Sequence, residues 1–149
     1  MTWKGCWNRR LKRGLLYVDS NVFLYPVVYD SEVIVEAKKS KDFLLKIAQG
    51  NVKACTATIT WDEIVWTIRK IFGFELSVEE GKKFLAFPNL KLLGVKKSTV
   101  FKAQEIMEKY SIKPRDAIHA AVALENNVTE VVSYDTDFDK IEGFKRVEP

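Results

Sequence analysis

Histidine and cysteine are scarce in this sequence, whose 149 residues include one histidine, His119, and two cysteines, Cys6 and Cys55. Two cysteines are too few for a disulfide framework, and with one histidine they show no spacing typical of a zinc site. The sequence also has no apolar run that approaches the roughly 20 residues of a membrane span, and its start lacks the apolar block of a secretory signal. We therefore expect a reduced, cytoplasmic protein.

Basic residues are concentrated at the start of the chain. Residues 1–13 carry a charge of +5 and no acid, whereas the remaining residues, with 19 bases and 20 acids, have a net charge of −1. Trp3 and Trp7 lie among these cations, so the segment could hold a nucleic-acid backbone by charge and stack on bases. The alternative is a terminal segment with no role in binding. We assign residues 1–14 to a basic extension and residues 15–149 to one domain.

Short apolar runs alternate with longer amphipathic segments along that domain. The runs predict strands at residues 15–18, 52–56, 90–95, 130–134 and 144–147. The intervening periodicity and turn residues predict helices at residues 22–25, 31–50, 60–73, 77–87, 97–110 and 114–126, and a short turn or helix at 137–141. Strands that alternate with helices imply an α/β fold, in which a mostly parallel sheet is covered on both faces.

Acidic residues stand at several of the predicted junctions between strands and helices. Asp19 follows the first strand, Glu63 lies in the first turn after the second, Asp116 opens a small apolar helix, and Asp135 ends the fourth strand with Asp137 close by. The carboxyl ends of parallel strands share one edge of a sheet, where such folds bind ligands. Crowded carboxylates repel one another unless a cation lies among them, and oxygen ligands suit Mg²⁺ or Mn²⁺ rather than Zn²⁺.

Each of these acids also has a simpler interpretation. A carboxylate in a first helical turn is favoured by the helix dipole, and aspartate is common in turns. Asp62 neighbours Glu63, but the two point about 100° apart around a helix, so we expect only one to serve a site. His119 follows Asp116 by three residues and could reach the same rim; we interpret it as a packed or half-exposed helix residue.

Four short motifs resemble those of the PIN-domain nucleases, and in particular the VapC-type toxins of prokaryotic toxin–antitoxin pairs. The motifs are Val-Asp-Ser-Asn-Val-Phe at 18–23, Glu-Ile at 63–64, Arg-Asp-Ala-Ile-His-Ala-Ala at 115–121 and Ser-Tyr-Asp-Thr-Asp-Phe at 133–138. Each is weak alone, but together they occur in the family's order and at its intervals. The resemblance covers residues 15–147, nearly the whole chain.

The resemblance implies a three-layer α/β/α domain with a mostly parallel five-stranded sheet. It also implies metal-dependent endoribonuclease activity, with Mg²⁺ or Mn²⁺ as cofactor and RNA as substrate. By position, Asp19, Glu63, Asp116 and Asp135 match the family's catalytic and metal-binding acids, and Asp137 is a candidate fifth ligand. A small antitoxin protein and a second copy of this chain in a homodimer are the partners that such a toxin implies.

Other functions fit the residues less well. A phosphatase with an aspartyl nucleophile also has Asp after its first strand, but it needs a second Asp two residues on, where this chain has Asn21. A receiver domain needs paired acids and a late lysine that we cannot place. Two alternatives stay open, namely an RNA-processing PIN nuclease without an antitoxin and a non-catalytic PIN-like module that binds RNA or protein.

Overall fold

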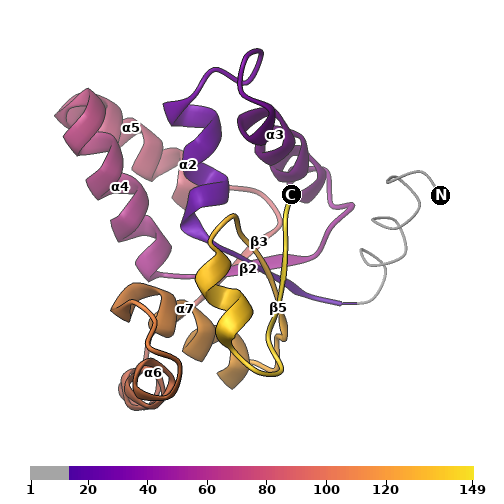
Figure 1. The fold of residues 1–149 in the computed structure, drawn as a ribbon. Helices are drawn as coiled ribbons and strands as arrows, with labels where there is room; N and C mark the ends of the chain where they lie inside the picture. Colours follow the sequence, from indigo (N-terminus) through magenta and orange to yellow (C-terminus); the bar gives the residue numbers. More distant parts are fainter. Residues whose placement is uncertain (1–13) are drawn as a thin grey trace.

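A five-stranded parallel sheet lies at the centre of the computed structural model, which describes residues 14–149 (Figure 1). The strands are β1 (Leu16–Val18), β2 (Ala54–Ala57), β3 (Leu90–Leu93), β4 (Glu130–Val132) and β5 (Lys145–Val147). They are ordered β3-β2-β1-β4-β5, and every neighbouring pair is parallel. The predicted α/β fold is thus confirmed. The expectations for the basic segment at residues 1–13 lie outside the described residues.

Six α-helices and one 3₁₀ helix connect these strands. They are α2 (Ser20–Val28), α3 (Val35–Ala48), α4 (Ile59–Phe72), α5 (Phe74–Leu85), α6 (Lys97–Tyr110), α7 (Pro114–Glu125) and η1 (Thr136–Lys140). The bounds predicted for α6 agree with the structure, and those for α7 differ by one residue. No helix in the described part of the chain is long and apolar enough to cross a membrane.

The predicted starts of α3 and α5 were wrong. Helix α3 begins at Val35 rather than residue 31, because Asp30 closes a turn by accepting the backbone N–H of Glu32 at 2.9 Å. Helix α5 begins at Phe74 rather than Ser77. Gly73 adopts a φ of +99°, which ends α4 and lets the next helix follow at once, and the Ser77 hydroxyl donates to the carbonyl of Phe74 inside the first turn.

Both faces of the sheet are covered, as alternation along its strands requires. Successive residues of a strand point to opposite faces. Tyr17 of β1 therefore shares a core with Ala120 of α7 on one face, while Leu16 and Val18 share a core with Ile68 of α4 on the other. Helices α6 and α7 cover the first face, and α2 to α5 cover the second. Full burial of each large apolar side chain contributes about 1.5–3 kcal/mol to the stability of the fold, so the two cores hold the strands and helices that border the sheet edge in place.

The chain order brings the ends of β1 and β4 together. From β1 the chain continues to β2 on one side, whereas from β4 it continues to β5 on the other. The carboxyl ends of two adjacent strands with such diverging connections border a crevice, which is the usual ligand position in open α/β sheets. Asp19 follows β1 and Ser133 follows β4, so both lie at this point of the sheet.

Candidate functional site

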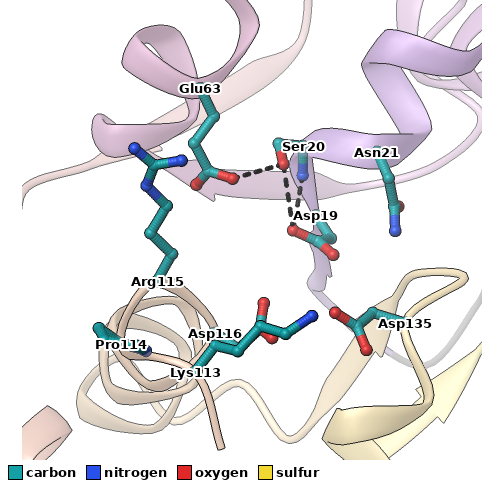
Figure 2. Close-up of a pocket in the computed structure, with 9 residues that line it drawn as sticks. All are labelled: Asp19, Ser20, Asn21, Glu63, Lys113, Pro114, Arg115, Asp116 and Asp135. Atoms are coloured by element: carbon teal, nitrogen blue, oxygen red, sulfur yellow. Dashed lines mark hydrogen bonds between the residues drawn. The ribbon is translucent and has the colours of Figure 1, made fainter. Parts of the chain in front are cut away.

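A pocket of about 510 Å³ opens at this edge of the sheet (Figure 2). It is lined by Asp19, Ser20, Asn21, Glu63, Lys113, Pro114, Arg115, Asp116 and Asp135. The four acids singled out in the sequence thus line one pocket, although they come from four different parts of the chain. The fifth, Asp137, does not line the pocket, but its carboxylate lies within 4.8 Å of ligand atoms of Asp116 and Asp135.

Asp19 is held at the junction between β1 and α2. It is the N-cap of α2, where its Oδ1 accepts the backbone N–H of Ser20 at 2.7 Å. Its Oδ2 accepts the hydroxyl of Ser133 at 2.6 Å, and the residue is only 4% exposed. Desolvation by burial raises the pKa of Asp19, an effect that the nearby His119 and the Ser133 hydrogen bond only partly oppose.

Glu63 reaches the pocket from just beyond the first turn of α4, rather than from within that turn as predicted from the sequence, because the helix begins at Ile59. Ile64 and Ile68 bury the face of α4 that packs on the sheet, and Glu63 borders that face, whereas Asp62 is exposed to solvent. The Ser20 hydroxyl donates to Glu63 Oε2 at 2.8 Å. Burial alone would raise the pKa of Glu63, but hydrogen bonding to His119 and its charge, with the Ser20 bond, hold that pKa below its ordinary value.

Asp116 and Asp135 face Asp19 from the other side of the pocket, as Figure 2 shows. Asp116 lies in the first turn of α7, and Asp135 is the N-cap of η1, where its Oδ1 accepts the backbone N–H of Asp137 at 2.9 Å. Burial, followed by the charges of Asp135 and Asp19, raises the pKa of Asp116 from 3.8 to about 7. Like charges are therefore crowded here.

The pocket offers two groups of ligand atoms that suit a cation. One consists of Asp19, Glu63 and His119, the other of Asp116, Asp135 and Asp137, and within each group the ligand atoms lie within 4.8 Å of one another. Asp116 Oδ2 is buried without a hydrogen-bond partner among the described residues. A buried carboxylate oxygen without a partner is costly, and a cation would satisfy it. The preponderance of carboxylate oxygens fits a hard divalent ion.

A cysteine-based site is excluded within the described residues. Cys55 is buried in β2, and desolvation raises the pKa of its thiol to about 12. The thiol therefore stays protonated at neutral pH and serves neither as a nucleophile nor as a metal ligand. Cys6 lies in residues 1–13, outside the described part.

The PIN domain family matches residues 16–143. The chain belongs to the PIN-domain family. This confirms the resemblance drawn from the four sequence motifs. The PIN domain is also similar to Ribonuclease VapC2 of Methanocaldococcus jannaschii, with 22% identity over 147 residues, which cover 94% of this chain and 99% of that protein.

Solved structures show the same fold. A chain of VapBC2 from Rickettsia felis, crystallised with a DNA fragment from the promoter of the pair, aligns with a TM-score of 0.68 and 16% identity over 91% of this chain and 98% of its own. VapC20 of Mycobacterium tuberculosis, described as a toxin that cleaves the sarcin–ricin loop, aligns with a TM-score of 0.70 and 16% identity over 90% of this chain and 99% of its own. At such identities the likeness establishes the three-layer PIN fold.

The site of this PIN domain includes two groups, His119 and Ser20, that were not assigned to it from the sequence. His119 is packed in α7, as one interpretation held, but it is completely buried and bonded to Glu63 through Nε2 and to the hydroxyl of Tyr17 through Nδ1. A lone imidazole among the buried alanines and valines of α7 has to find polar partners, and this signal was present in the sequence. Ser20, which links Asp19 to Glu63, had no comparable signal.

Two cations also line the PIN pocket beside its acids. Lys113 is the N-cap of α7 and Arg115 lies in its first turn. In Figure 2 the Arg115 guanidinium extends toward Glu63, while the Lys113 ammonium extends toward Asp135. The charge of Arg115 contributes to the lowered pKa of Glu63. Within residues 14–149 neither cation forms an ion pair or a side-chain hydrogen bond, so both are available to an anionic ligand.

Proposed function

We propose that this PIN domain is a metal-dependent endoribonuclease that hydrolyses RNA phosphodiester bonds. The observation that carries the proposal is the convergence of Asp19, Glu63, Asp116 and Asp135 on one pocket in which a buried Asp116 oxygen lacks a partner. Similarity to a protein named as a VapC ribonuclease supports the same activity. The proposed cofactor is Mg²⁺ or Mn²⁺.

Each acid has a role that follows from its surroundings. Asp19 and Asp116 would hold the ion directly, because both are buried and desolvation raises their pKa values, an effect that a bound cation would oppose. Asp135 completes the ligand set beside Asp116, supported by Asp137. Glu63, whose pKa is lowered, stays ionised and either binds the ion or orients the attacking water. The bound ion would lower the pKa of water and stabilise the charge that develops on the phosphate oxygens.

The two cations at the pocket support a phosphodiester substrate. Without an ion, the four acids of the pocket repel a polyanion, whereas Lys113 and Arg115 attract one. RNA phosphates that contact these two side chains would lie beside the acids that line the same pocket. The strand is thereby oriented by charge, independently of its base sequence.

We further propose that the chain is the toxin of a VapBC-type pair, acts as a homodimer and binds a small antitoxin. The support is the similarity of its fold to chains of toxin–antitoxin assemblies, among them the Rickettsia felis VapBC2 structure and a toxin–antitoxin complex from Klebsiella pneumoniae. Co-expression with a small protein encoded beside this chain tests the pairing. A stable complex that blocks cleavage is expected, and cleavage unaffected by any such neighbour supports an RNA-processing nuclease instead.

A direct assay tests the nuclease activity. Single-stranded RNA is incubated with the protein in Mn²⁺, in Mg²⁺ and in EDTA, and DNA of the same sequence serves as the comparison substrate. We expect internal cleavage of RNA in both metals, none in EDTA, and little or no cleavage of DNA. If RNA is bound but remains intact under every metal condition, the chain is a binding module and the proposal is wrong.

A further inference from the structure

A buried chain of hydrogen bonds leads from the sheet to Glu63. The backbone N–H of Ala57 in β2 donates to the hydroxyl oxygen of Tyr17 in β1 at 3.2 Å. That hydroxyl contacts Nδ1 of His119 at 2.5 Å, and His119 Nε2 contacts Oε1 of Glu63. Tyr17 and His119 are both completely buried, so this series of hydrogen bonds runs through the core between the sheet and α7.

The direction of each hydrogen bond follows from the groups at its two ends. The Ala57 N–H can only donate, so the Tyr17 hydroxyl donates its hydrogen to Nδ1 of the neutral imidazole, whereas in the protonated ring Nδ1 donates to the hydroxyl oxygen. The Glu63 carboxylate can only accept, so His119 Nε2 donates to it. Nε2 carries this hydrogen in the neutral and in the protonated ring alike, so the orientation of Glu63 does not depend on the charge of the imidazole.

Glu63 is consequently fixed from two sides. Its Oε1 accepts from His119 and its Oε2 accepts from Ser20 at 2.8 Å, so its carboxylate cannot rotate without losing one of two hydrogen bonds. His119 Nε2 also lies 3.7 Å from Asp19 Oδ1, which places the imidazole beside the carboxylates of Asp19 and Glu63; because Nε2 carries a hydrogen, it supports these two acids and is not itself a ligand. A free glutamate side chain would otherwise sample several rotamers and lose entropy on binding an ion.

We propose that Tyr17 and His119 are positioning residues that set the Glu63 carboxylate for a divalent cation. This inference rests on the metal-dependent function proposed above. Partners that orient a ligand from behind are typically worth about 10–100-fold in metal affinity or activity. A purely structural role, in which the two side chains only satisfy each other in the core, would change stability and leave metal affinity unaltered.

Two substitutions of His119 separate these roles. In His119→Gln the amide nitrogen occupies roughly the place of Nε2 and still donates to Glu63, whereas in His119→Asn it occupies the place of Nδ1 and reaches only Tyr17. Both variants introduce a polar amide into the same buried position, so they are matched in their general effect on the core. Tyr17→Phe removes only the hydroxyl, and Asp62→Ala serves as a surface control on α4.

The readout is Mn²⁺ affinity, measured by the electron paramagnetic resonance signal of free Mn²⁺, together with thermal unfolding in EDTA. We expect His119→Asn to weaken Mn²⁺ binding about 10–100-fold, whereas the Mn²⁺ affinity of His119→Gln should stay closer to that of wild type. The unfolding temperatures of the two variants should be comparable. Wild-type Mn²⁺ affinity in a folded His119→Asn would overturn the inference. If that variant does not fold, Tyr17→Phe decides, with weakened affinity expected and wild-type affinity contradicting it.

The same experiment distinguishes this inference from the proposed function. A wild-type protein that binds Mn²⁺ but cleaves no RNA contradicts the ribonuclease proposal, and the affinities of the His119 variants still test the positioning role. A wild-type protein that cleaves RNA, with variants that bind Mn²⁺ equally well, contradicts the positioning role alone.

Discussion

The hydroxyl of Ser133 donates to Asp19 Oδ2 at 2.6 Å and joins two positions 114 residues apart in the chain. The Ser133 oxygen also accepts the backbone N–H of Asp135 at 2.9 Å and the side-chain amide of Asn21 at 3.2 Å. Ser133 thus links both acids that flank the crevice between β1 and β4. One completely buried hydroxyl sets the spacing between the two halves of the pocket.

Substitution of Ser133 by alanine tests this link. The change leaves a buried oxygen of Asp19 without its donor, so we expect a loss of about 1–3 kcal/mol in the free energy of unfolding and weaker Mn²⁺ binding. Ser133→Thr keeps the hydroxyl and should retain most of the Mn²⁺ affinity. Urea unfolding and Mn²⁺ titration of the three proteins measure both effects. An alanine variant that equals wild type in both measurements would show that the hydroxyl has no such role.

The raised pKa of Asp116 predicts a pH-dependent stability in the metal-free protein. Asp116 loses its proton near pH 3.8 in the unfolded chain but at about pH 7 in the fold. Between these values the folded state holds a proton that the unfolded state has released, so stability falls as pH rises and the loss is complete above pH 7. Asp116→Asn removes this contribution.

Thermal unfolding in EDTA from pH 4 to pH 8.5 measures the contribution of Asp116 to this pH dependence. The unfolding temperature of Asp116→Asn, relative to that of wild type, should increase as pH rises toward 7. Above pH 7 the difference between the two unfolding temperatures should stay constant. Mn²⁺ at pH 7.5 should stabilise wild type and do so much less for the variant. A difference between the two proteins that does not change with pH would contradict the crowding of charge inferred at Asp116.

Local sequence signals were enough to predict most of the fold. The period of apolar residues located α6, and Pro114 marked the start of α7, because these features act within one helix. The position of Asp19 directly after β1 was also predicted, whereas Asp135, expected to end the fourth strand, lies beyond the end of β4 at Val132 and is the N-cap of η1. The starts of α3 and α5 could not be predicted from local signals, since they depend on the Asp30 turn and on the backbone of Gly73.

The supporting contacts of the site were beyond sequence reasoning for a different reason. His119 and Glu63 are 56 residues apart, and their hydrogen bond depends on how α7 and α4 pack around β1 and β2. Periodicity shows that a helix position is buried, but it does not show which polar group lies opposite. The same holds for Ser20, whose neighbours in the sequence give no sign that it bridges two acids.

Asp62 and Glu63 form a natural pair for a test of which acid serves the pocket. Asp62 is exposed, whereas Glu63 lines the pocket with two hydrogen-bond donors on its carboxylate. We expect Asp62→Ala to retain wild-type RNA cleavage and Glu63→Gln to lose about 10²-fold or more, because even an outer partner of a metal ligand is worth about 10–100-fold. Initial rates at saturating Mn²⁺ provide the comparison. The reverse pattern would place the functional acid one residue earlier.

Lys113 and Arg115 should control the affinity for RNA rather than the chemistry. Replacement of both by Gln removes two phosphate contacts, so the slope of log affinity against log salt should flatten by about 0.7 per lost contact for a single strand. Lys53→Gln with Lys145→Gln is a matched control, because these exposed lysines lie at the opposite edge of the sheet. Fluorescence anisotropy at several salt concentrations measures the slopes. Equal slopes in the two double variants would exclude the proposed contacts.

RNA cleavage by Asp19→Asn and Asp116→Asn at saturating Mn²⁺ tests the central claim most directly. Both changes preserve side-chain shape while removing a charge from the buried acids that we propose as direct metal ligands. We expect each variant to keep the fold, as judged by circular dichroism, and to cleave RNA at least about 10²-fold more slowly than wild type. A folded Asp116→Asn variant that cleaves RNA at the wild-type rate would contradict it.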